Sequence, residues 1–189
     1  MERAVVMTGI GGQGIQLIAK LLAQAGMREG KQVMMFGLFM GMIRGGSSES
    51  TVVLADQEIT APPIVPAVWG VVAMHGEGLP KLAAKVERGG VLVYNASLIA
   101  TPPAWDAVRT IAVPATALAR ELGQVMGASM IALGAFASAT GLVAAESLAA
   151  ALGDVLPPHR RQLIETNRRC LERGAEYVGR GLAPASRAG

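Results

Sequence analysis

The stretch TGIGGQGIQLIAKLL, residues 8–22, places the strongest constraint on the fold of this chain. An apolar run over residues 4–8 leads into its glycines, and apolar residues then recur at helical spacing from Ile15 to Ala25. A strand, a glycine turn and a helix in this order predict the start of a βαβ unit, with residues 31–36 as its second strand. The glycine loop then lies at the carboxyl edge of the sheet.

The rest of the chain continues this α/β pattern. Residues 50–54 read as a strand that turns at 56–57, which predicts a hairpin over 50–59. Further strands are expected at 68–74, 90–95 and 110–113, and helices at 78–86, 115–122, 126–142 and 157–177. The predicted fold is a Rossmann-like three-layer α/β sandwich, with a mostly parallel sheet, an inserted hairpin and C-terminal helices. We expect one domain over residues 1–178 and a flexible tail over 179–189.

The glycines Gly9, Gly11 and Gly14 satisfy the dinucleotide fingerprint G-x-G-x-x-G. An NAD site also needs an acidic residue at the end of the second strand, to bind the ribose hydroxyls. The segment QVMMFGLFMGMIRGG, residues 32–46, contains no Asp or Glu, and its Arg44 lies well past the strand for an NADP phosphate. The loop also lacks the G-K-[ST] ending of a P-loop. The sequence therefore argues against a conventional dinucleotide or nucleoside triphosphate site.

The glycine loop keeps its physical capacity to bind a ligand. Glycines let the backbone approach closely, and free amides at a helix start favour an anion or a carbonyl. Gln13 can offer both a donor and an acceptor to a ligand or a neighbouring residue. The alternative is that the glycines only permit a tight turn between strand and helix.

Composition limits the other classes of function. Hydrophobic residues make up 51% of the 189 residues and charged residues only 16%, which suggests that partner chains cover part of the surface. The net charge of +3 and the sparse aromatics argue against nucleic-acid binding. The one cysteine, Cys170, excludes an iron–sulfur cluster or a cysteine-rich zinc site held by this chain alone, and no other metal-ligand set is predicted. With no disulfide framework and no export signal at the N-terminus, we expect a cytoplasmic protein.

Residues 125–145 carry no charge over a length close to that of a membrane span. Several small and hydroxylated residues interrupt this stretch, and no basic flank of the usual kind adjoins it. We therefore predict no membrane span, and interpret the stretch as a buried helix at a subunit interface.

A set of motifs in a fixed order carries a family resemblance: GIGGQG at 9–14, RGG at 44–46, the expected hairpin running into APPIVP, GGVLVYNASL at 89–98, GASMIALGAF at 127–136 and ETNRRCLERG at 165–174. Over residues 4–175 the chain resembles the gamma subunit, or gamma domain, of the 2-oxoacid:ferredoxin oxidoreductases. These thiamine-diphosphate enzymes oxidise pyruvate, 2-oxoglutarate, indolepyruvate and similar acids, and usually release an acyl-CoA.

The resemblance implies a role inside a larger complex. Alpha, beta and ferredoxin-like delta subunits would hold thiamine diphosphate, magnesium and the iron–sulfur clusters, and electrons would leave to ferredoxin or to a flavoprotein. This chain would contribute to a cleft for coenzyme A or the cofactor, with its loops as the walls. The implied binding residues are Gly9, Gly11, Gly12, Gln13, Gly14, Arg44, Gly45, Gly46 and Asn95. An ion pair between Arg44 and a partner chain is the alternative for that residue.

The chain cannot catalyse this reaction alone, because it lacks the G-D-G motif of thiamine binding and grouped cysteines. Two features depart from the family pattern. The apolar FGLFMGMI before RGG replaces a more polar segment and would suit an aromatic 2-oxoacid, and Ser129 stands where Asn is usual. Two alternatives stay open: a free-standing Rossmann-type oxidoreductase that binds a nucleotide or flavin, and a scaffold subunit whose glycine loop contacts only protein.

Smaller candidates accompany these motifs. His75 ends the fourth apolar strand near Glu77, so an acid–base pair and a purely structural histidine are both open interpretations. Asn95 sits at a strand end and can equally cap the following segment. The arginines at 160, 161, 168, 169 and 173 are interpreted as a solvated or partner-facing surface, and Cys170 among them as a buried thiol.

Overall fold

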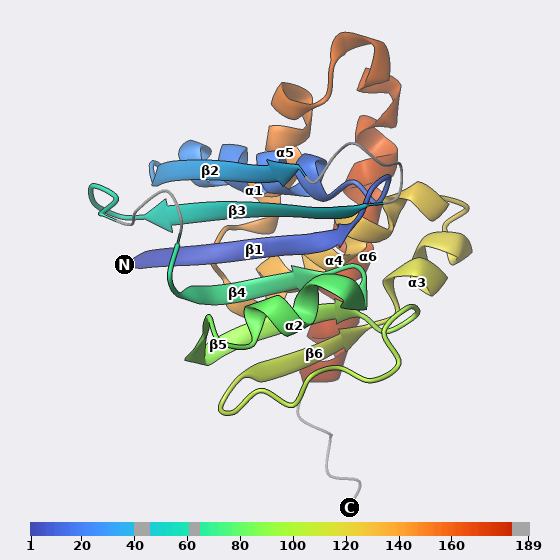
Figure 1. Cartoon of the computed structure of the whole chain (residues 1–189). Helices are drawn as coiled ribbons and strands as arrows, with labels where there is room; N and C mark the ends of the chain where they lie inside the picture. The colour runs from blue at the N-terminus through green and yellow to red at the C-terminus, as the bar shows by residue number, and fades with distance from the viewer. Residues whose placement is uncertain (40–45, 61–64, 183–189) are drawn as a thin grey trace, which may run out of the picture.

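The computed structural model describes residues 1–39, 46–60 and 65–182. Its centre is one six-stranded sheet in the order β2-β3-β1-β4-β5-β6, in which β1, β4, β5 and β6 are parallel (Figure 1). The strands are β1 (Glu2–Ile10), β2 (Gln32–Phe39), β3 (Ser47–Ala55), β4 (Val68–Ala73), β5 (Val86–Asn95) and β6 (Arg109–Val113). The predicted α/β class with a mostly parallel sheet is confirmed.

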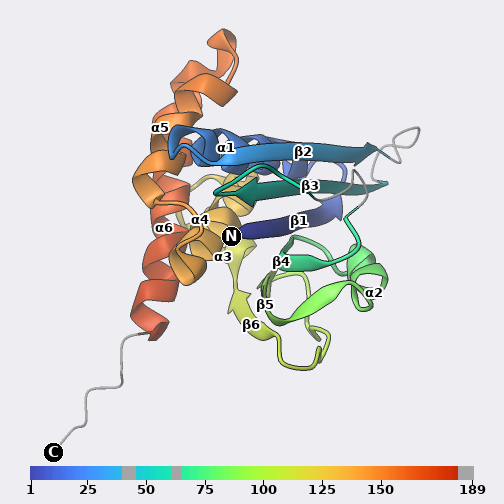
Figure 2. The ribbon, with the colours of Figure 1, turned by 90° about the vertical axis from the view of Figure 1, so that its left-hand side faces the viewer.

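Helices cover both faces of the sheet, which makes three layers. The side view shows α2 on one face and the larger helices together on the other (Figure 2). The helices are α1 (Ile15–Arg28), α2 (Leu79–Leu82), α3 (Ala115–Glu121), α4 (Ala128–Thr140), α5 (Ala145–Val155) and α6 (Ile164–Leu182). Short 3-10 segments precede α2, α4 and α6, at Gly76–Gly78, Val125–Gly127 and Pro158–Leu163.

The inserted hairpin lies elsewhere than the sequence predicts. β3 pairs antiparallel with both β1 and β2, so that Val52 sits opposite Val5 on one side and Met35 on the other. The hairpin therefore consists of β2 and β3, and residues 56–60 follow β3 without forming a strand. The expected hairpin over 50–59 is wrong, because the polar residues Ser48 and Glu49 are held in the sheet by partner strands on both sides, β1 and β2.

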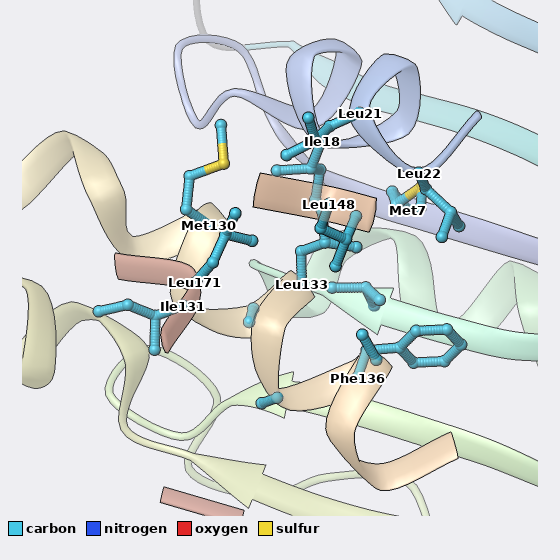
Figure 3. Packing of buried hydrophobic residues seen from close by; sticks show 14 of the residues in the cluster. Met7, Ile18, Leu21, Leu22, Met130, Ile131, Leu133, Phe136, Leu148 and Leu171 are labelled. Carbon is cyan, nitrogen blue, oxygen red and sulfur yellow. The ribbon is translucent and has the colours of Figure 1, made fainter. Parts of the chain in front are cut away.

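Helix α4 is buried on all sides. Every residue from Ala128 to Ala137 is buried, and the helix packs most extensively on α6. Leu133 and Phe136 of α4 meet side chains of α1, α5 and β1 in the core (Figure 3). The predicted buried helix is thus present, but this chain's own elements bury it. In the described part of the chain, no helix has the length and apolar character needed to cross a membrane.

Two differences concern the C-terminal helices. The sequence missed α5, a short helix whose buried residues Leu148, Ala151 and Leu152 lie on one face. Helix α5 lies against α1. Helix α6 continues to Leu182, past residue 178, where the sequence places the end of the domain.

Candidate functional site

The glycine loop joins the carboxyl end of β1 to the first turn of α1, at the edge of the sheet where the parallel strands end (Figure 1). Gly12 and Gly14 adopt positive φ angles of 93° and 78°, in the region that residues with side chains rarely occupy. Gly9 still belongs to β1, and a β-carbon there would lie 2.5 Å from Oε1 of Gln13. Positions 12 and 14 thus require glycine because of their positive φ angles, and position 9 requires it because a β-carbon would clash with the Gln13 side chain.

Gln13 folds back over the loop. Its Oε1 accepts a hydrogen bond from the backbone N–H of Ile10 at 2.9 Å. The acceptor end of the amide is therefore used by a neighbouring residue inside the loop, one of the two partners that the sequence left open. The Nε2 group has no hydrogen-bond acceptor within the described ranges, so Gln13 can present a donor.

The second predicted loop meets the first through Gly46. The backbone N–H of Gly11 donates to the carbonyl oxygen of Gly46 at 2.9 Å. The end of the RGG segment therefore lies beside the glycine loop, as the implied two-walled cleft requires. Arg44 and Gly45 lie outside the described residues.

The start of α1 offers unpaired donors. Its N-cap residue, Gly14, provides no side-chain cap, and the first turn contains no acidic residue. The backbone N–H groups of Gly12, Gly14, Ile15 and Gln16 have no acceptor in the part of the chain that the structure describes. These groups carry the partial positive charge of a helix N-terminus, so the loop can bind an anion or a carbonyl oxygen.

Asn95 ends β5 at this edge, but its side chain points into the protein. It is fully buried, its Nδ2 donates to Oγ1 of Thr116 at 2.8 Å, and its Oδ1 accepts from the backbone N–H of Thr116 at 3.2 Å and of Ser97 at 3.3 Å. These bonds fasten the first turn of α3 to the end of β5. The structure favours the capping interpretation over ligand binding for this residue.

The His75 side chain also hydrogen-bonds to the backbone. Its Nδ1 accepts a hydrogen bond of 3.4 Å from the N–H of Glu77 and so caps the 3-10 segment Gly76–Gly78, while the Glu77 side chain is exposed. This geometry joins the histidine to the main chain of Glu77 and not to its carboxylate. The structural interpretation of His75 is the one that the contacts support.

Cys170 is fully buried on α6, where its Sγ packs against Gly127. Burial raises the pKa of the thiol, and the nearby charge of Arg169 opposes that shift only in part. The predicted buried thiol is confirmed. No cluster of three or more His, Cys, Asp or Glu residues within 1–39, 46–60 and 65–182 has a metal-binding arrangement.

A cavity of about 390 Å³, here called the loop cavity, opens where the glycine loop faces the N-terminal ends of α4 and α6. Gly12 and Gly14 form one wall, and leucine and methionine side chains line much of the rest. Its polar lining residues are Gln124, Ser129, Arg160, Thr166 and Asn167. The sequence assigned Arg160 to a surface and gave none of the five a binding role. They lie more than a hundred positions from the loop, so no local pattern could have found them.

A larger hollow of about 750 Å³ lies between the edge strand β6 and the C-terminal half of α6. Arg109, Arg173 and Arg180 surround it. It contains none of the predicted binding residues, and it is open to solvent along the sheet edge. Of these two cavities, the loop cavity is the one that coincides with the described part of the predicted site.

The family model described as pyruvate ferredoxin/flavodoxin oxidoreductase matches residues 4–177. The chain is 29% identical to the 2-oxoglutarate synthase subunit KorC of Methanothermobacter thermautotrophicus, over 96% of this chain and 97% of that protein. It is 31% identical to the ketoisovalerate oxidoreductase subunit VorA of the same organism, over 94% of this chain but only 36% of that protein. The chain therefore spans about a third of one relative and nearly all of the other.

Two solved structures share the fold of this chain. The gamma subunit of a keto/oxoacid ferredoxin oxidoreductase from Geobacter sulfurreducens superposes with a TM-score of 0.82 at 26% identity, over 95% of this chain and 98% of that one. The 2-oxoglutarate:ferredoxin oxidoreductase from Magnetococcus marinus, solved with 2-oxoglutarate, coenzyme A and succinyl-CoA bound, gives a TM-score of 0.82 at 21% identity. That alignment covers 97% of this chain and 32% of the other.

Proposed function

The chain belongs to the pyruvate ferredoxin/flavodoxin oxidoreductase family, and we propose that it is the gamma subunit of a complex that oxidises a 2-oxoacid and forms an acyl-CoA. Relatives named as subunits of 2-oxoglutarate synthase and ketoisovalerate oxidoreductase support this role. The gamma-subunit fold extends over nearly the whole chain.

The cofactors of the redox chemistry belong to other subunits in this proposal. The chain has a single cysteine, and its Sγ is buried, so it does not fit an iron–sulfur cluster. Thiamine diphosphate with magnesium and the clusters would be held by alpha, beta and ferredoxin-like delta subunits. Ferredoxin or a flavoprotein would take the electrons, and the complex would work in the cytoplasm.

The observation that carries the proposal is the hydrogen bond between Gly11 and Gly46. It joins the glycine loop to the end of the RGG segment directly beside the uncapped start of α1. An anionic ligand at this junction would meet amide donors from a fixed turn, without a carboxylate in the first turn of α1 to repel it. Coenzyme A carries such groups in its phosphates.

Each residue has a definite part in this arrangement. Gly9 leaves room for the folded Gln13 side chain, Gly11 holds Gly46, and Gly12 and Gly14 expose their amides. Gln13 contributes its Nε2 donor. Thiamine diphosphate supplies the decarboxylation when bound in the partner subunits; this chain binds and orients the acyl acceptor. We include Arg44 and Gly45 among the proposed binding residues because they belong to the RGG motif of the family.

A charge change at Gln13 tests this role. Gln13→Glu keeps an oxygen that accepts from the N–H of Ile10, but it replaces the Nε2 donor with negative charge. In the complex purified through a tag on this chain, we expect normal assembly and a KM for coenzyme A raised about tenfold, the loss of one hydrogen bond to a charged group. Gln57→Glu adds the same charge at an exposed turn and serves as the control.

Two results would contradict the proposal. Equal KM values for coenzyme A in Gln13→Glu and Gln57→Glu would remove the glycine loop from the ligand site. Native mass spectrometry that finds only copies of this chain with a bound nucleotide would support the alternative of a free-standing nucleotide-binding oxidoreductase.

A further inference from the structure

Strand β6 leaves one edge of the sheet open. It is the last strand in the sheet order, and among the described residues it pairs only with β5. The carbonyl oxygen of Val113 points to the β5 side, where it accepts from the N–H of Ala96 at 2.8 Å. Because successive residues of a strand direct their backbone groups to opposite edges, the N–H and carbonyl groups of Thr110 and Ala112 point away from β5. Both residues are exposed, so β6 presents a template for one more strand.

Helix α6 forms a floor beside this open edge. In the side view, α6 runs along one face of the sheet and its C-terminal end projects beyond β6 (Figure 2). The hollow of about 750 Å³ lies between the two elements, and Ile111, Tyr177 and Val178 are among its lining residues. These three side chains belong to the core or pack against it, so the floor of the hollow is largely apolar. An added strand would pair with β6 and pack one row of its side chains on α6.

Three arginines give the hollow a positive rim. Arg109 is exposed, and its Nη1 donates to a backbone carbonyl oxygen of α4 at 3.1 Å. None of the carboxylates that the structure describes lies within ion-pair distance of Arg109. Arg173 pairs with Glu121 at 3.3 Å, and Arg180 pairs with Glu176 at 3.7 Å. No aspartate or glutamate is among the described lining residues, so Arg109 can take a carboxylate from outside the chain.

The charge of the rim selects among the possible occupants of the edge. Pairing β6 with β6 of a second copy would bring two sets of the three arginines into one interface, where like charges repel. A basic segment would be repelled in the same way. An acidic segment would instead place a carboxylate against Arg109, while its backbone pairs with Thr110 and Ala112. The chemistry of the edge therefore favours an extended segment with an acidic side chain.

We propose that β6 and the C-terminal half of α6 form a docking groove for an extended, acidic segment of another subunit of the complex. The segment adds a strand to the sheet at β6, and one of its carboxylates pairs with Arg109. This inference rests on the proposed function, because that function supplies the partner chain. The groove contains none of the residues proposed to bind coenzyme A.

Hydrogen–deuterium exchange with residue-resolved fragmentation tests the strand pairing. The 189-residue chain alone is compared with the complex purified through a tag on this chain. In the free chain, the outward N–H groups of Thr110 and Ala112 should exchange quickly, because water reaches them. In the complex both should be slowed about tenfold or more, the effect of one new hydrogen bond each. The N–H of Ile111, which already points to β5, should change less.

Ala112→Pro removes one outward donor and leaves the bonds to β5 in place. Proline is tolerated on an edge strand where its nitrogen faces solvent, and urea unfolding of the free chain checks that the variant folds. Ala112→Ser is the matched control, since it changes the same side chain and keeps the N–H. Each variant is produced together with the unmodified chain, both in excess over the partner subunits, and mass spectrometry of the complex gives their ratio. Ala112→Pro should be incorporated about tenfold less than Ala112→Ser, because one hydrogen bond is lost.

Arg109→Glu tests the charge without altering the backbone, and it replaces the proline variant if Ala112→Pro proves unstable. Its incorporation in the same competition should fall about fivefold or more, because a carboxylate then faces the acidic segment. Arg109→Lys keeps the positive charge at the same position and should stay within about threefold of the unmodified chain.

Three outcomes would overturn the inference. Thr110 and Ala112 exchange equally fast in the free chain and in the complex; or the two variants of either pair are incorporated equally; or the edge is protected in the chain alone when native mass spectrometry finds a dimer, which would assign it to a second copy. Each of these leaves the gamma-subunit role intact, provided that the tag recovers partner subunits. Recovery of no partner subunit would contradict the proposed function itself, and the inference would fall with it.

Discussion

Gly134 of α4 and Gly174 of α6 lie where the two helices touch backbone to backbone. A β-carbon on Gly134 would collide with the carbonyl of Leu171, and one on Gly174 with the carbonyl of Ile131. The two glycines thus let the buried helix α4 pack directly against α6, which closes the core. Because α6 also brings Thr166 and Asn167 to the loop cavity, this contact connects core packing with the candidate site.

Gly174→Ala is expected to lower the free energy of unfolding by at least about 2 kcal/mol, because the clash is with backbone atoms that no rotamer change can relieve. Gly179→Ala lies on the same helix with nothing within 4 Å of its β-carbon, and should stabilise the chain by up to about 1 kcal/mol. Urea unfolding of both variants measures the difference. Similar stabilities for the two would mean that α4 and α6 are not in close contact.

Asn95→Leu tests whether the Asn95 side chain caps α3 or binds coenzyme A. Loss of the Oδ1 acceptor leaves the buried N–H of Thr116 unpaired, so unfolding should become easier by about 1–3 kcal/mol. Ser97→Ala, which removes an exposed acceptor for the N–H of Ala117 at the same junction, should cost about 1 kcal/mol or less. The KM for coenzyme A should not change in either variant. A raised KM with unchanged stability would restore Asn95 as a ligand residue.

His75→Ala should leave turnover of the complex and its pH–rate profile unchanged, because the imidazole is joined to the backbone of Glu77. Loss of the cap should reduce stability by about 1 kcal/mol, and His75→Asn, which keeps a capping acceptor, should recover most of it. Disappearance of one limb of the pH–rate profile in His75→Ala would instead indicate acid–base catalysis.

The buried thiol of Cys170 should make the free energy of unfolding depend on pH. Burial raises the pKa of its thiol in the folded chain, so the unfolded chain releases this proton at a lower pH than the folded one. Above the ordinary thiol pKa of about 8.5, the unfolded state binds fewer protons and stability falls as the pH rises.

The measurement compares urea unfolding at pH 7.5 and 9.5, under reducing conditions, for the unmodified chain and Cys170→Ala. The unmodified chain should lose more stability between the two pH values than the variant does; the other titrating groups are common to both and cancel. An identical pH dependence would show that the thiol has the same pKa in the folded and unfolded chain.

Some of the site could be predicted because its signals are local. The apolar residues 4–8, the glycines that follow and the helical spacing from Ile15 define β1, the loop and α1 without distant information, and their order with the RGG and YNASL segments was enough to predict the family, which is confirmed. The proximity of the glycine loop to Gly46 was expected from the family resemblance. That these loops bind a ligand stays a prediction.

The sequence by itself thus determined the strand–loop–helix start, the α/β class and the uncharged, buried helix α4, because hydrophobic periodicity and glycine conformations depend on neighbouring residues. Only the tertiary structure decided that β3 lies between β1 and β2, that Asn95 turns inward to Thr116, and that Ser129 and Arg160 reach the glycine loop. These features depend on contacts between segments far apart in the chain. Which of the possible partners wins is set by packing and hydrogen bonding across the whole domain, and no local pattern encodes that choice.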